Sequence, residues 1–321
     1  MFGKRTAAGV WRCRTDGRWE PAARQRSLAF GKVIATGEHD AWAFGWKIVG
    51  ISAWIPMADG PQRPTAFRWD GDRWRSGALP VEHGTIGPVA ASGPADVWAV
   101  GDTGILRWDG RSWAVVHRSP GMVGDLAVLA ADDVWVFGDH RAWHYDGATW
   151  SRRPLPFRAA QVSARSATDI WALDDDALRL HHFDGEDWHR IDPTPALPEI
   201  PPSTYPPGPQ LTAITADPTG VWITGEIGMS SFLLVPAGSG WRYEDTSTTA
   251  GRMIRDIPPV PDGEGGHWLV GSTDINGHDS ALAHRDPSGH WTTIPAGGEL
   301  TSLSATPGGT LLAAGRISVI G

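Results

Sequence analysis

The sequence predicts an all-β fold assembled from one repeated unit of four short strands. Three segments, 95–113, 132–150 and 168–188, align with little adjustment. Each contains an apolar run around a Trp, then an aromatic residue before Asp-Gly, and then a second Trp. Asp-Gly between two alternating runs is a strong hairpin signal, because both residues tolerate the positive φ angles of a tight turn. No segment of useful length has the apolar period of a helix.

Within each unit we expect four strands in a fixed order, a to d. Strand a is small and apolar, as at 87–91, and strand b is the run around the first Trp. Strand c carries the aromatic residue before Asp-Gly, and strand d begins at the Trp that follows. Of the 19 tryptophans, all but Trp46 and Trp54 fall at these repeated positions. The tryptophans are therefore expected to be mainly architectural.

The number of units follows from the tryptophans that open strand d. These are Trp19, Trp74, Trp113, Trp150, Trp188, Trp241 and Trp291. Seven units give about 46 residues each, the size of a four-stranded propeller blade. The chain begins with strands c and d and ends with strands a and b. We therefore expect one domain, 1–321, forming a seven-bladed β-propeller with four antiparallel strands per blade, closed by a shared blade from 9–22 and 299–321.

The turns of the repeat carry a resemblance to known families. Trp-Asp-Gly-x-x-Trp at 69–74 and 108–113, and Tyr-Asp-Gly-x-x-Trp at 145–150, resemble the turns of kelch and Asp-box (BNR-like) repeat propellers. The resemblance covers the whole chain, but its motif is structural. It implies a disc with a central channel and no particular chemistry.

Composition limits the function classes. The chain has 28 Lys and Arg against 36 Asp and Glu, a net charge of −8, so nucleic-acid binding has no electrostatic support. We expect no membrane partner, because no apolar run reaches the length of a span. The start of the chain lacks the apolar stretch of a secretory signal, so the expected location is cytoplasmic, with export by another route left open. We expect no cofactor and no metal, since no standard metal-ligand spacing occurs.

The longest connections are expected on one face of the propeller, which we call the top face. In this fold the b–c and d–a connections share a face, and the long segments 45–64, 191–210 and 271–280 all belong to these two classes. Long loops on one face of a fold often carry its functional residues. Alternatively, these loops seal the fold or contact a second copy. The segment 191–210 has eight prolines in twenty residues, which suits either a partner-binding strap or a semi-rigid spacer.

Two groups of residues are candidates for a top-face site. Trp46 and Trp54, in the loop 45–64, could stack on a sugar or an aromatic ligand, or could form a small core beneath the loop. The position four residues after the strand-b Trp is acidic in four successive units, and these carboxylates could bind a cation, sugar hydroxyls or a proton in catalysis. As the alternative, each acid caps a tight turn. The acids are Asp102, Asp139, Asp175 and Glu226.

Two arginines complete the candidate site. Arg255 interrupts an otherwise small, apolar strand, and Arg316 takes the position of the acids in the last unit. An arginine near the channel mouth could hold a carboxylate, although a solvated or internally paired side chain is the simpler interpretation.

Two functions from different classes remain. The favoured one is a binding module that holds a small molecule, a glycan or a protein on its top face. The alternative is an enzyme, a glycosidase, lyase or cyclase, that uses the top-face carboxylates.

Overall fold

The structure is a computed structural model, and it describes residues 5–13, 19–23, 28–48, 62–118, 121–175, 179–201, 204, 208–253, 257–272 and 279–319. Apart from one short 3₁₀ turn, η1 (Thr194–Ala196), the regular elements of this part of the chain are β-strands. The all-β prediction is therefore confirmed. Contacts within the chain separate a first unit, Met1–Pro120 with Ala296–Gly321, from a second unit, Gly121–Pro295.

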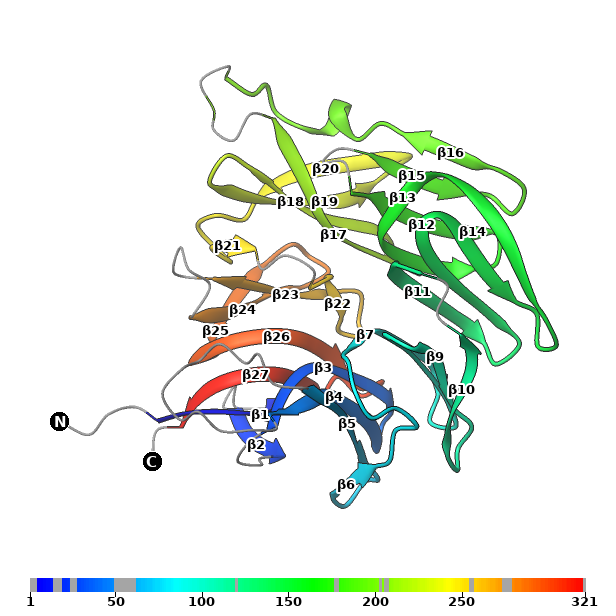
Figure 1. The fold of residues 1–321 in the computed structure, drawn as a ribbon. Helices are drawn as coiled ribbons and strands as arrows, with labels where there is room; N and C mark the ends of the chain where they lie inside the picture. The colour runs from blue at the N-terminus through cyan, green and yellow to red at the C-terminus, as the bar shows by residue number, and fades with distance from the viewer. Residues whose placement is uncertain are drawn as a thin grey trace. The chain divides into compact units, whose positions relative to one another are not determined.

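Three four-stranded antiparallel sheets make up the described part of the first unit (Figure 1). The end sheet has the order β2-β1-β27-β26, with β1 (Arg5–Cys13), β2 (Trp19–Ala23), β26 (Gly298–Ala305) and β27 (Leu311–Val319). The second sheet contains β3 (Leu28–Gly37), β4 (Asp40–Ile48), β5 (Gln62–Trp69) and β6 (Trp74–Gly77) in this order. The third sheet has the order β10-β9-β8-β7, with β7 (Ile86–Gly93), β8 (Asp96–Gly101), β9 (Gly104–Trp108) and β10 (Trp113–Arg118).

The described part of the second unit also contains three antiparallel sheets. A six-stranded sheet follows the chain order through β11 (Val123–Ala130), β12 (Asp133–Tyr145), β13 (Trp150–Ser166), β14 (Asp169–Asp174), β15 (Leu180–Phe183) and β16 (Trp188–Ile191). The next sheet contains β17 (Pro209–Asp217), β18 (Gly220–Ile227), β19 (Ser230–Ala237) and β20 (Gly240–Asp245). The last contains β23 (His267–Ser272), β24 (Ser280–Arg285) and β25 (Trp291–Pro295), and the short strands β21 (Arg252–Met253) and β22 (Val260–Pro261) both pair with β23.

The described strands form six sheets, so the predicted count of seven blades is wrong. The repeats at 123–154 and 157–191, which the sequence predicts as separate blades, share the six-stranded sheet. The cause is β13, which runs for 17 residues without a break. Its first half pairs with β12 and its second half with β14. Because no turn separates the two halves, the hydrogen-bonded ladder continues from one repeat into the next.

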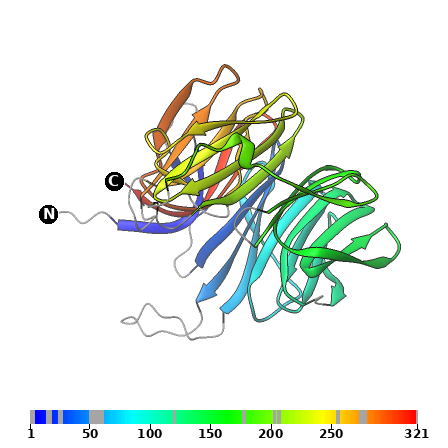
Figure 2. The ribbon, with the colours of Figure 1, turned by 90° about the horizontal axis from the view of Figure 1, so that it is seen from above.

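Strands from both ends of the chain share the end sheet. β1 pairs with β27 from Arg5 opposite Val319 to Arg12 opposite Leu312. Figures 1 and 2 show the blue β1 beside the red β27 from two directions. The sequence expects the same two segments in one blade. This pairing covers an edge of β1 and an edge of β27 that would otherwise expose unpaired backbone groups.

The Asp-Gly turns explain why the hairpins recur. Between β9 and β10, the Asp109 carboxylate accepts hydrogen bonds from the backbone N–H groups of Ser112 and Arg111, both at 2.8 Å. These bonds lower the pKa of the Asp109 carboxyl. Gly110 follows with a φ of 91°, a region that favours glycine. Asp70, Asp146 and Asp184 accept the same bonds, so these aspartates shape turns.

Aromatic packing between neighbouring sheets supplies much of the core. In the first unit, the ring of Trp42 on β4 lies 4.9 Å from that of Trp108 and 5.1 Å from that of Trp113 in the third sheet. Trp42 is 1% exposed and packs with Phe44 and Leu106 in the same buried cluster. The strand-b tryptophan of one sheet therefore packs against the strand-c and strand-d tryptophans of the next.

Side chains on strand a, the inner strand of one repeat, also accept hydrogen bonds from backbone N–H groups on strand a of the next repeat. In the first unit, Ser302 and Ser304 on β26 accept the N–H groups of Val33 and Ala35 on β3, at 3.2 and 3.0 Å. In the second unit, Gln161 on β13 accepts the N–H of Ile214 at 2.6 Å. These bonds connect strands that belong to different sheets, because an inner strand has a free backbone edge that requires partners.

A glycine recurs three residues after the strand-b Trp, and at Gly45 the close approach of two backbones leaves no room for a side chain. A Cβ atom at Gly45 would overlap the carbonyl oxygen of Ala29, next to a bulge in β3. Gly101 has the same place in the third sheet, yet a Cβ there would find no atom nearer than 3.5 Å. The two positions therefore form a natural pair for comparison.

We expect Gly45→Ala to lower the free energy of unfolding by about 2 kcal/mol or more, because the methyl group would push β3 and β4 apart. Gly101→Ala should cost less than about 1 kcal/mol, since the site has room and alanine lowers the entropy of the unfolded chain. Chemical denaturation of both variants beside the wild type measures the difference. Equal losses would contradict the proposed overlap at Gly45.

Candidate functional site

A polar clamp holds the buried tryptophan of strand b. In the third sheet, the Trp98 Nε1–H and the Arg107 Nε–H both donate to Asp96 Oδ1, at 3.0 and 2.8 Å. The Arg107 guanidinium carbon lies 4.8 Å from the centre of the Trp98 ring. Asp96 and Trp98 are two residues apart and share a face of β8, while Arg107 is the partner of Trp98 on β9. The fully buried indole is thus satisfied by the carboxylate, whose charge the arginine balances.

The clamp recurs with histidine as the base. In the six-stranded sheet, Trp135 and His144 both lie within hydrogen-bond distance of Asp133 Oδ1, at 3.0 and 2.9 Å, and their rings stack with centroids 4.1 Å apart. The sequence suggests a solvated row of bases at this position of strand c, whereas the His144 side chain is only 21% exposed. Asp169, Trp171 and His182 repeat this arrangement. The pairs Asp40–Arg68 and Asp262–His284 keep the acid and the base beside Trp42 and Trp268, but the buried Trp42 N–H has no hydrogen-bond partner among the described residues.

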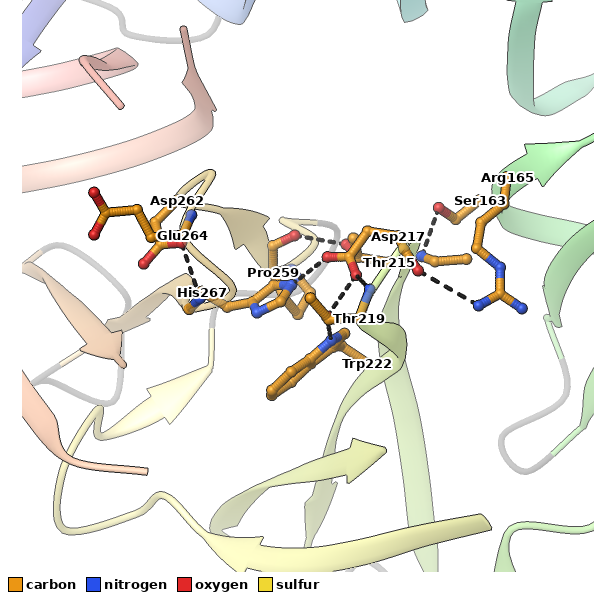
Figure 3. A network of polar contacts seen from close by, with 12 residues as sticks. Ser163, Arg165, Thr215, Asp217, Thr219, Trp222, Pro259, Asp262, Glu264 and His267 are labelled. Atoms are coloured by element: carbon orange, nitrogen blue, oxygen red, sulfur yellow. Dashed lines mark hydrogen bonds and ion pairs between the residues drawn. The ribbon is translucent and has the colours of Figure 1, made fainter. Parts of the chain in front are cut away.

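The sheet β17–β20 has a rearranged clamp, whose histidine comes from β23 (Figure 3). Gly220 takes the position of the aspartate, and the Trp222 Nε1–H donates to Thr219 Oγ1 at 2.8 Å. Thr219 in turn donates its backbone N–H to Asp217 at 2.7 Å, and Asp217 Oδ2 lies 2.6 Å from His267 Nε2. His267 is fully buried, with its ring 4.0 Å from that of Trp222. This buried pair joins two sheets of the second unit.

Among the predicted carboxylates, the structure brings Asp139 and Asp175 together through an arginine. Arg158 Nε lies 3.0 Å from Asp139 Oδ1, and its Nη1 lies 2.9 Å from Asp175 Oδ2. Arg158 lies where β13 leaves β12 and begins to pair with β14. Sequence reasoning missed it, because its role depends on the continuous path of β13. The two acids therefore bind an internal cation.

Two further predicted acids serve local structure. Asp102 accepts hydrogen bonds from the hydroxyl and the backbone N–H of Thr85, at 2.9 and 3.3 Å. It thereby fixes the segment that leads into β7. Glu226 lies within β18 and is only 4% exposed.

Of the predicted top-face tryptophans and arginines, the structure describes Trp46 and Arg316, which lie on strands of two different sheets. Trp46 lies in β4 opposite Pro64, with its ring next to Gly31, so the predicted loop 45–64 is shorter than expected. Arg316 is exposed near the end of β27. Trp54 and Arg255 lie outside the described residues.

An open groove in the first unit lies beside β10. Its volume is about 740 Å³, and it is bounded by the segment Pro80–His83 on one side and by Val115–Arg118 of β10 on the other, with Thr103 at one end. Burial lowers the pKa of the His117 imidazole, so this residue is neutral at pH 7. Asp102 lies next to Thr103 and holds Thr85, so one predicted residue supports this groove from behind.

β10 presents apolar side chains to solvent along this groove. Val115 and Val116 are 43% and 39% exposed. Val116 is the extra residue of a bulge, since Val115 pairs with Leu106 and His117 with the next residue, Ile105. The other outer strand segments mostly carry charges or proline at comparable positions, namely Glu20-Pro21, Arg75, Arg152-Arg153, His189-Arg190 and Arg242. β10 therefore presents two valines to solvent, although its bulge and the terminal Arg118 are themselves features that protect an edge strand.

Two negative findings concern the described residues alone. No group of three or more His, Cys, Asp or Glu side chains in this part of the chain could hold a metal ion. None of its helices is long and apolar enough to cross a membrane.

Comparison with known proteins shows the fold. No family model and no curated protein matches the chain. A structure of YCF48 bound to D1 peptide has a TM-score of 0.60 at 15% identity, over 93% of this chain and 99% of that one. Streptogramin B lyase has a TM-score of 0.63 at 10% identity, over 97% and 98%. The β-propeller domain of Myceliophteria thermophila Cps50 (Swd1) has 0.60 at 11%, over 91% and 98%.

These similarities establish a β-propeller fold, and at such low identity they establish the fold alone. The expected resemblance to kelch or Asp-box families is not confirmed by them.

The clamp predicts a large effect of removing its carboxylate. Asp96→Ala removes the carboxylate that accepts both the Arg107 and the buried Trp98 N–H groups, so we expect a loss of about 3 kcal/mol in the free energy of unfolding. Asp96→Asn keeps an acceptor oxygen and should lose less. Denaturant titration of the two variants measures both losses. An alanine variant as stable as the asparagine variant would show that the clamp contributes little.

The buried Asp217–His267 pair predicts a pH effect. Burial disfavours the Asp217 charge, but hydrogen bonds from His267 and Thr219 outweigh it, so the pKa lies below the usual 3.8. A lowered carboxyl pKa contributes stability above 3.8 that is lost as the pH falls through the folded-state value. Asp217→Asn should therefore be less stable than the wild type near neutral pH, and the gap should narrow from about pH 5 to about pH 2. A gap that stays constant would contradict this assignment.

Proposed function

We propose that the protein is a binding module that holds an extended segment of a partner protein against β10. The observation that carries the proposal is the exposed pair Val115–Val116 on an outer strand beside the groove. The segment adds a further strand to the third sheet. Its backbone bonds to the edge of β10, and its side chains occupy the groove.

The backbone edge of β10 supports strand addition. Among the described strands β10 is the terminal strand of its sheet and pairs with β9, so its other edge is available for backbone hydrogen bonds. Valine has a high β propensity and packs well against β-branched or aromatic residues on a neighbouring strand. The bulge at Val116 presents two successive valines, which enlarges the apolar contact.

The polar groups of the groove define the partner further. Arg118 follows the valines at the end of β10 and is exposed, while Glu82 and His83 lie on the opposite wall. We infer a segment with apolar or β-branched side chains over the valines and an acidic residue next to Arg118. YCF48, which shares the fold, was solved bound to a peptide, which supports a peptide as the class of ligand.

The alternative of an enzyme with top-face carboxylates receives less support. Asp102 holds Thr85, and Arg158 pairs with both Asp139 and Asp175. A pair of carboxylates that works as acid and base would have to face a ligand rather than an internal partner. The arrangement of the described acids therefore favours binding over hydrolysis or elimination.

Selection from a displayed library of random peptides of about ten residues tests the proposal. We expect peptides with an apolar centre and an acidic residue to bind the wild type. Val115→Lys/Val116→Lys places charges on β10 like those of the other outer strands, so it should fold and bind these peptides at least about tenfold more weakly. Thr292→Lys, an exposed position on the outer strand β25, is the matched control and should bind like the wild type.

Amide hydrogen exchange locates the bound peptide. Strand addition should slow exchange in 114–118 and in 80–83 when the peptide is present. Failure to select any peptide, equal affinity of the double variant, or slowed exchange confined to other strands would overturn the proposal.

A further inference from the structure

A second cavity lies in the first unit, between the end sheet and the second sheet. Its volume is about 450 Å³. Its walls include Arg12, Glu20, Glu38, Trp69, Trp74 and Leu312. None of these residues lines the groove beside β10, so the cavity is a separate feature of the same unit.

The end sheet has only part of the clamp that holds the strand-b tryptophan elsewhere. Leu312 on β27 lies opposite Arg12 on β1, just as Trp42 lies opposite Arg68 in the second sheet. Thr310 stands two residues before Leu312, where the clamp has its aspartate. The end sheet therefore keeps the basic residue but has neither the indole nor the carboxylate.

The facing wall of the cavity is of the kind that receives an indole. Trp42 packs against Trp108 and Trp113 of the following sheet, with ring centroids 4.9 and 5.1 Å away. The residues at these same repeat positions in the sheet that follows Leu312 are Trp69 and Trp74, and both line the cavity. A leucine side chain does not extend as far as an indole. The cavity thus corresponds to the space that a strand-b tryptophan fills between the other two sheets of the unit.

The polar groups around the cavity match those that surround an indole in the clamps. Arg12 Nε donates to Glu20 Oε1 at 2.7 Å, and the two side chains are 48% and 30% exposed. A guanidinium in this register lies over the indole ring in the third sheet. Glu20, a carboxylate with several acceptor positions, is able to accept an additional N–H while it pairs with Arg12.

The local charge selects among aromatic ligands. Three carboxylates line the cavity, from Glu20, Glu38 and Asp40. Arg12 pairs with Glu20 and Arg68 pairs with Asp40, so these described charges sum to one negative charge. The surplus of negative charge favours a neutral or cationic ligand over an anionic one.

We propose that this cavity binds a small planar nitrogen heteroaromatic molecule, whose ring takes the place of the strand-b indole. The ring packs against Trp69 and Trp74 and under the Arg12 guanidinium. Its N–H group donates to the Glu20 carboxylate, as the Trp98 N–H donates to Asp96 in the complete clamp.

Three probes of the same ring and different charge test the proposal by calorimetry. Tryptamine is cationic, indole is neutral and indole-3-acetate is anionic at neutral pH. We expect tryptamine to bind most tightly, indole next and indole-3-acetate least. No binding of tryptamine or indole at probe concentrations of about 1 mM, or the reverse order, would overturn the proposal.

Two variants connect binding to the cavity itself. Thr310→Asp/Leu312→Trp rebuilds the complete clamp with Arg12, so it should raise the denaturation midpoint and weaken tryptamine binding at least about tenfold. Glu20→Gln removes one negative charge from a partly exposed site, so it should fold and should reduce the preference for tryptamine over indole. If the first variant binds tryptamine like the wild type, or if Glu20→Gln keeps the full preference, the site is not this cavity.

Val115→Lys/Val116→Lys is the control that separates the two sites. It should bind tryptamine like the wild type while it loses the selected peptides. A loss of tryptamine binding in this variant would place the probe in the groove beside β10 and would overturn the assignment of the cavity.

Discussion

In three of the described sheets a buried indole has its N–H group satisfied by a nearby side chain, and this constraint organises much of their structure, whereas the buried Trp42 N–H of the second sheet has no hydrogen-bond partner in the described part of the chain. An aspartate two residues earlier on the same strand shares the face of a satisfied indole and accepts its N–H, as Asp96 does for Trp98. The buried carboxylate then needs a cation, which Arg107 provides from the paired strand while it lies over the ring. One sequence motif, Asp-x-Trp followed by a base on the next strand, therefore contains a complete set of mutually satisfied groups.

The same need to satisfy polar groups governs both edges of each sheet. On the inner side, a side chain of one sheet bonds to the backbone of the next, as Ser302 does for Val33 and Gln161 for Ile214. On the outer side, charged residues such as Arg75 and Arg190 disfavour pairing with another chain. The inner strand edges thus bond one sheet to the next within each unit, whereas the charged outer strand edges disfavour pairing with other molecules. β10, with its exposed valines, departs from the second part of this arrangement.

The repeat allowed the strands, the hairpins and the shared end sheet to be predicted from the sequence, because each depends on local signals such as Asp-Gly. The number of sheets was predicted wrongly, because it depends on whether β13 breaks between two repeats, and its sequence contains prolines that suggest a break. The carboxylates Asp139 and Asp175 were predicted at the ends of strands, whereas Asp139 lies within the continuous strand β12, and their common partner Arg158 lies on β13. Residues that are brought together by the path of the chain in three dimensions, and not by a fixed spacing in the sequence, cannot be paired from a single sequence.

Repetition also provides an internal standard for separating architecture from function. A residue that recurs at the same register, such as the strand-b aspartate, is explained by the clamp and needs no ligand. A position that departs from the repeat needs another explanation. The joining of the two chain ends in one sheet does not explain Leu312, because Arg12 is still paired opposite it. A cavity between two sheets lowers stability, so a sheet selected only to join the chain ends would be expected to keep the indole. Retention of the base and the facing tryptophans, with loss of the indole and of the aspartate that accepts its N–H, is the pattern that a ligand-filled clamp would produce.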